Sequence, residues 1–154
     1  MNERKGLEGL LAWQKSMEFA KRIYTDVIPL LPKEEKWVIG SQLRHAASIV
    51  PANMAEGYGR FYFQEGVRFS YIARGSLEEI LTFLTLAKDL NYLPVELFES
   101  LRVEVLEIKR IIGGYIAYLK KSKPGQYEPG AEIGTGESRD AYLITTDEAE
   151  DIDA

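Results

Sequence analysis

The stretch that decides the fold of this 154-residue chain lies in its first half. It reads Gln42-Leu43-Arg44-His45-Ala46-Ala47-Ser48-Ile49-Val50-Pro51-Ala52-Asn53-Met54-Ala55-Glu56-Gly57-Tyr58-Gly59-Arg60. Apolar residues recur at three- and four-residue steps, which predicts a helix with one buried face. Small residues, one proline and several polar groups lie inside the same pattern, a mixture that an ordinary surface helix does not need. The stretch therefore predicts a helix in close contact with its neighbours.

The helical period extends over most of the chain on both sides of this stretch. Four predicted helices span Leu7 to Leu31, Lys33 to Tyr58, Phe63 to Leu90 and Pro94 to Lys121. Asn91, just after the third, suits the left-handed conformation at a helix C-terminus. Short connections between long amphipathic helices favour an antiparallel up-down-up-down bundle. We therefore expect an all-α four-helix bundle over residues 1–123, with an irregular, flexible acidic tail over residues 124–154.

The charge is divided between these two regions. The whole chain has a net charge of −5, but residues 1–123 hold 18 Lys and Arg against 15 Asp and Glu, a net charge of +3. Residues 124–154 hold nine acids and one Arg, a net charge of −8. A mildly basic body can bind a polyanion, and an acidic tail can compete with that polyanion.

The composition excludes several kinds of site. The chain has no cysteine, so it forms neither disulfides nor thiolate metal sites. Its one histidine, His45, cannot supply the two Glu-x-x-His pairs of a di-iron bundle. We expect no metal and no cofactor. The charged N-terminus and the lack of a long apolar run predict a cytoplasmic protein without a membrane segment.

The polar residues inside the helical pattern have two readings. In the structural reading, Pro51 kinks the helix, Ser48 satisfies the carbonyl that Pro51 frees, and Ala46, Ala47 and Ala52 allow close packing of a neighbouring helix. The alternative for Pro51 is that its kink shapes a groove or an oligomer contact. Asn53 with Glu56, and Ser76 with Glu79, then form a buried polar layer that sets helix register. The rival is an acid/base site, which needs a further carboxylate or histidine that the sequence does not identify. We therefore expect no enzyme.

Gly57 and Gly59 are predicted to stop the helix; they do not form a phosphate loop, because no strand precedes them.

Basic residues provide the main functional signal, since clustered Lys and Arg side chains can engage phosphates. The rival reading is that they lie on ordinary solvated bundle faces. The candidate nucleic-acid-binding residues are Lys15, Lys21, Arg22, Arg60, Arg68, Arg74, Lys109, Arg110, Lys120, Lys121 and Lys123.

The stretch quoted above, with Ala73-Arg74-Gly75-Ser76-Leu77, resembles a known family over about Leu10 to Lys123. The family comprises four-helix-bundle proteins encoded in intervening sequences of bacterial 23S rRNA genes. These look related to the accessory (Avd-type) proteins of diversity-generating retroelements. The residues that carry the family motif here are Arg44, Ser48, Pro51, Asn53, Glu56, Gly57, Gly59, Gly75, Ser76 and Glu79.

The resemblance implies partners and an assembly state. It implies a homopentamer, and either a reverse transcriptase with its structured RNA or a ribosomal RNA as partner. Aromatic residues near the predicted helix ends, among them Trp37 and Phe61, also favour a homo-oligomer. We expect a non-enzymatic oligomer that binds RNA, DNA or a nucleic-acid enzyme. The alternative is a protein adaptor that docks through residues 142–146 and binds no nucleic acid.

Overall fold

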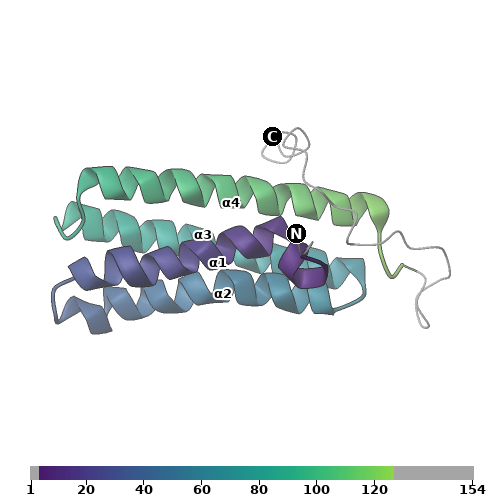
Figure 1. Cartoon of the computed structure of the whole chain (residues 1–154), viewed down its shortest axis with the longest axis horizontal. Helices are drawn as coiled ribbons and strands as arrows, with labels where there is room; N and C mark the ends of the chain where they lie inside the picture. The colour runs from purple at the N-terminus through teal and green to yellow at the C-terminus, as the bar shows by residue number, and fades with distance from the viewer. Residues whose placement is uncertain (1–3, 127–154) are drawn as a thin grey trace.

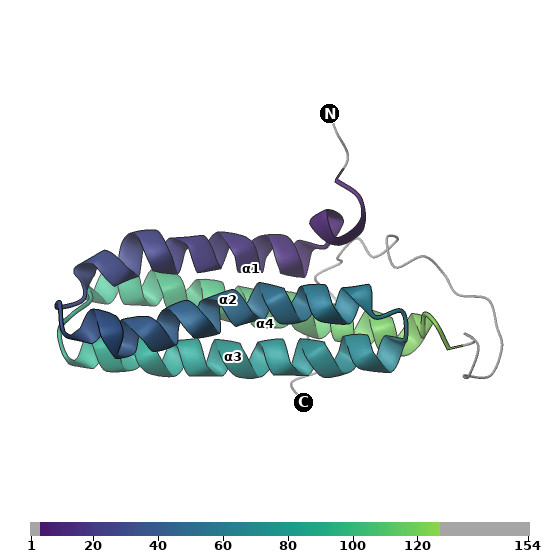
Figure 2. The same ribbon diagram turned by 90° about the horizontal axis from the view of Figure 1, so that it is seen from below.

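A computed structural model describes residues 4–126 of the chain. It contains four long helices, α1 (Leu11–Arg22), α2 (Ile39–Gly59), α3 (Phe63–Asp89) and α4 (Val95–Ser122). Each helix packs antiparallel to the next, and α1 closes the bundle against α4 (Figures 1 and 2). The predicted all-α, up-down-up-down bundle is confirmed, and residues 4–126 contain no strand. The predicted acidic tail lies almost entirely outside the described residues.

The first two predicted helices differ from the observed ones at the connection between them. After α1 the chain widens into a π-helical turn, Ile23–Val27, and then tightens into a 3-10 turn, Ile28–Leu30. Pro29 has no N–H for the carbonyl four residues earlier, so an α-helix cannot continue through it undisturbed. A second 3-10 turn, Glu35–Trp37, precedes α2, which begins at Ile39 instead of Lys33.

Two buried residues lie at the two ends of the connection between α1 and α2. Leu31 and Ile39 are both buried, at opposite ends of the reversal between α1 and α2. The chain reverses between them through Pro32 and the 3-10 turn Glu35–Trp37, so both side chains enter the same core from successive helices. Arg44 reinforces this turn, because its guanidinium donates to the backbone carbonyl of Lys36 at 2.9 Å and lies over the ring of Trp37.

A close contact between glycines joins α2 to α3. A Cβ added to Gly57 would lie 3.2 Å from Cα of Gly66 and 3.0 Å from Cβ of Phe69. A Cβ on Gly66 would in turn lie 2.9 Å from a methyl group of Leu119 on α4. Gly57 lies inside α2, which continues to Gly59, so the prediction that it stops the helix is wrong. It permits close packing instead.

The predicted polar layer between helices is also wrong. The side chain of Asn53 donates to the carbonyl of Ile49, and Ser76 donates to the carbonyl of Ile72. Both bonds stay within one helix, because a short polar side chain readily reaches the carbonyl four residues earlier. Glu56 and Glu79 are exposed.

The expected role of Ser48 beside Pro51 is wrong as well. Ser48 donates to the carbonyl of His45, whereas the carbonyl that Pro51 leaves without its helical donor is that of Ala47. Pro51 is buried, and α2 continues past it as one element. Ala46 and Ala47 are buried as the close-packing reading requires, but Ala52 is exposed.

Backbone conformation and backbone hydrogen bonds define the ends of α3 and α4, which lie at opposite ends of the bundle. Asn91 takes a left-handed conformation with φ 61° after α3, as its position in the sequence predicts. Beyond α4, the carbonyl of Pro124 accepts a bond from the N–H of Phe63 at 2.9 Å. Pro124 and Gly125 are buried, so the packed body extends to residues just past Lys123.

Two glycines provide a test of the close α2–α3 contact. We expect Gly57→Ala to lower the free energy of unfolding by about 1–3 kcal/mol, because its Cβ meets backbone atoms that cannot move aside. Gly75→Ala is the control, since nothing lies within 4 Å of its added Cβ. It should raise stability by up to about 1 kcal/mol, the difference in helix propensity. Urea unfolding followed by circular dichroism measures both, and equal effects of the two substitutions would contradict the contact.

Candidate nucleic-acid interface

The charges of α3 and α4 separate along the length of the bundle. Residues 63–77 and 108–123 hold seven Lys and Arg against one Glu, a net charge of +6. Residues 78–89 and 95–107 hold two Lys and Arg against seven acids, a net charge of −5. We call these the basic half and the acidic half of the α3–α4 hairpin. Because the helices are antiparallel, each half lies at one end of the bundle (Figure 1).

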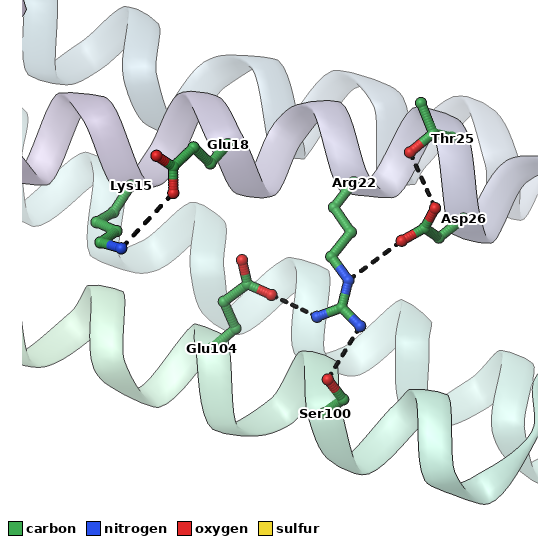
Figure 3. A network of polar contacts seen from close by, with 7 residues as sticks. All are labelled: Lys15, Glu18, Arg22, Thr25, Asp26, Ser100 and Glu104. Atoms are coloured by element: carbon green, nitrogen blue, oxygen red, sulfur yellow. Dashed lines mark hydrogen bonds and ion pairs between the residues drawn. The ribbon is translucent and has the colours of Figure 1, made fainter.

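Two of the predicted cations connect helices. Arg22 on α1 donates to Glu104 at 2.6 Å and to Ser100 Oγ at 2.9 Å, both on α4, and to Asp26 at 3.2 Å (Figure 3). The bond to Glu104 raises the pKa of Arg22 above its ordinary value, so its charge is permanent. Lys109 on α4 pairs with Glu78 on α3. Both cations have carboxylate partners within the bundle, so the structure gives them a packing role.

Arg60 and Arg68 lie on either side of one carboxylate. Glu65 Oε2 is 3.6 Å from Arg60 and 3.7 Å from Arg68, and Arg60 also donates to Glu56 at 2.9 Å. Both guanidiniums lie over the ring of Phe69. Their side chains stay about half or more exposed, at 51% and 67%. This cluster holds two cations at the start of α3 while one acid partly neutralises them.

Tyr71 joins α3 to the end of α4 at the centre of the basic half. Lys120 donates to its hydroxyl at 3.0 Å and lies 5.4 Å from its ring centroid. The Arg74 guanidinium is 6.0 Å from the same ring. No carboxylate among residues 4–126 lies within ion-pair distance of Lys120. We call Tyr71, Arg74 and Lys120 the Tyr71 cluster.

The sequence did not identify Tyr71 as a site residue. It lies three residues from both Arg68 and Arg74, so helical spacing was a signal that an aromatic ring shares their side of α3. The contact with Lys120 joins positions 49 residues apart, and no local pattern contains it.

The remaining predicted residues are spread over the surface. Lys15 pairs with Glu18 along α1 at 3.6 Å, and Lys21 is exposed on the same helix. Arg110, Lys121 and Lys123 are exposed on α4 and its end, within the basic half. Among the family-motif residues, Gly59, Gly75 and Glu79 are exposed, whereas Gly57 and Pro51 are buried.

The described part of the chain shows neither a membrane-spanning helix nor a cluster of metal ligands. No helix within residues 4–126 is long and apolar enough to cross a membrane. Over the same residues, no group of three or more His, Asp or Glu side chains is placed to hold a metal ion.

Comparison with known proteins identifies the family. Residues 8–114 match the model of the 23S rRNA-intervening sequence protein family. The fold is similar to that of a protein of unknown function from the S23 ribosomal protein family of Bacteroides thetaiotaomicron, with 24% identity and a TM-score of 0.64. That match covers 69% of this chain and 98% of the other. No curated protein matches the chain. Because the family model spans more than half of its residues, the chain belongs to the 23S rRNA-intervening sequence protein family.

Proposed function

We propose that this protein is a non-enzymatic, homo-oligomeric bundle that binds nucleic acid through the basic half of the α3–α4 hairpin. The observation that carries the proposal is the net charge of +6 collected at one end of that hairpin. Phosphates bind such a surface because they release condensed counterions when Lys and Arg neutralise them. The acidic half repels phosphates, which confines the nucleic acid to the other end.

The family supports an RNA context for this binding. Its description refers to intervening sequences of 23S rRNA, so ribosomal RNA is one candidate partner. The resemblance to accessory proteins of diversity-generating retroelements favours a reverse transcriptase and its structured RNA instead. Genomic position, inside an rRNA gene or beside a reverse transcriptase, separates these two partners.

A protein adaptor is the second candidate function. Exposed apolar side chains gather in the two connections at the other end of the bundle, where Trp37 is 77% exposed and Val38 and Val95 about 60%. Exposed apolar surface of this kind marks contacts with proteins. Residues 142–146, the docking segment expected for an adaptor, lie outside the described residues. Binding that weakens as salt rises supports the nucleic-acid function. Binding that is independent of salt supports the adaptor.

Oligomerisation is supported by exposed aromatic side chains at both ends, since Phe61 at the α2–α3 turn is 59% exposed. A closed ring would repeat the basic half in every subunit and enlarge the positive surface. We expect light scattering at micromolar concentration to give a closed oligomer, with a mass near five times 17.5 kDa for the pentamer. A mass of 17.5 kDa alone would exclude the assembly.

Neutralising two cations of the basic half tests where phosphates bind. Lys120→Gln with Lys121→Gln should weaken RNA binding and lower the slope of log affinity against log salt by about 2. Lys33→Gln with Arg102→Gln is the control, because it removes the same charge near the opposite end. Fluorescence anisotropy at several salt concentrations measures both slopes. Equal losses in the two variants would show that net charge alone governs binding.

The acidic residues after Gln126 should compete with nucleic acid. Residues 127–154 contain nine acids and one Arg, and they follow Lys121 and Lys123 closely in the sequence after α4. Tethering gives an effective concentration of about millimolar. Deleting residues 127–154 should therefore tighten RNA binding, and the gain should shrink as salt rises.

A matched variant separates the charge of this segment from its length. It keeps all 154 residues and replaces the nine acids with Asn or Gln. It should bind as tightly as the truncated protein if repulsion and competition by charge are responsible. If the truncated and full-length proteins bind equally well, the segment does not regulate the basic half.

A further inference from the structure

We infer that the Tyr71 cluster is a stacking site for an unpaired base, so that the basic half prefers single-stranded to duplex nucleic acid. The inference rests on the proposed nucleic-acid function and names the form of the ligand. It starts from the position of an aromatic ring among cations, a combination that proteins use to hold single strands.

The ring of Tyr71 is not required by the core. Its side chain is 44% exposed, while the neighbouring α3 positions Ser70, Ala73 and Leu77 are buried. The faces of an exposed ring present apolar area to water. A base that stacks on the ring covers part of that area. Tyr71 therefore gains from a planar aromatic partner, and no other aromatic ring within residues 4–126 pairs with it.

The position of Tyr71 is held from both helices. Its hydroxyl accepts the 3.0 Å bond from Lys120, which ties the tip of the ring to the last turns of α4. Its backbone belongs to the middle of α3, a 27-residue helix. Because both ends of the side chain are held, the ring loses little conformational freedom when a base stacks on it.

The surrounding cations suit the backbone of the same strand. Lys120 and Arg74 lie 5.4 Å and 6.0 Å from the ring centroid, and Lys121 follows on α4. Successive phosphates of a single strand flank each base, so a base on Tyr71 brings phosphates towards these side chains. In a duplex the bases are stacked inside and paired, and none can reach the ring without leaving the helix.

Strand form and base content test the site on the full-length protein. Labelled oligo(U) and oligo(dT) 12-mers, an abasic 12-mer and a 12-base-pair RNA duplex are titrated at one salt concentration. We expect Tyr71→Leu to weaken binding of both base-bearing single strands roughly tenfold, the loss typical of one stacked base. Binding of the abasic strand and the duplex should change less than twofold, because their phosphate contacts remain. Agreement of oligo(U) with oligo(dT) shows that stacking, common to RNA and DNA, carries the effect.

Tyr71→Phe is the matched variant, since it keeps the ring and removes only the hydroxyl. It should bind the single strands within about twofold of the unaltered protein. If Tyr71→Phe loses as much affinity as Tyr71→Leu, the hydroxyl and Lys120 form a phosphate contact and the stacking site is wrong. An equal loss of affinity for all four probes would assign Tyr71 to the stability of the fold instead. A changed subunit number in light scattering would assign it to a subunit contact.

The proposed function fails in a different way. If the unaltered protein binds none of the four probes at low salt, the basic half does not bind nucleic acid at all. If it binds them with steep salt dependence but without an effect of Tyr71→Leu, the basic half stands and the stacking site is overturned.

Discussion

The close approach of α2 and α3 at Gly57 and Gly66 is the constraint on which the rest of the bundle depends. With no side chain on either residue, the two backbones can lie within a few ångströms of each other. Leu119 of α4 then packs over Gly66, so the same point sets the position of the last helix. Lys120 follows Leu119 directly, so the packing of Leu119 on Gly66 places Lys120 beside α3, where it contacts Tyr71.

The Lys and Arg side chains of this molecule fall into two groups, those paired between helices and those exposed on the surface. Arg22 and Lys109 lie between helices and have carboxylate partners there, so they help to hold α1 and α3 against α4. Partly exposed pairs of this kind contribute little stability each, but they define which faces meet. The cations exposed on the basic half include Arg68, Lys120 and Lys121. Glu65 is the one acid within residues 63–77 and 108–123. The second group lies on the surface that we propose for nucleic-acid binding.

The charge division also gives the bundle a direction. Placing seven acids and seven cations on opposite halves of one hairpin creates an electric field along its length. Under the proposed function, this field attracts a nucleic acid to the basic half and repels it from the acidic half. The exposed Trp37 lies away from the basic half, so a protein partner and a nucleic acid can use different ends of the molecule.

The sequence by itself determined the number of helices, their order and their amphipathic faces, because a 3.6-residue apolar period is a local property. It also predicted the left-handed Asn91 and the basic character of residues 1–123. Tertiary structure decided which polar groups bond within their own helix, as Asn53 and Ser76 do, and which cations have partners across helices. It also decided that Gly57 packs inside a helix and that Tyr71 meets Lys120. These features depend on the distance between residues far apart in the chain, which is set only when the helices pack.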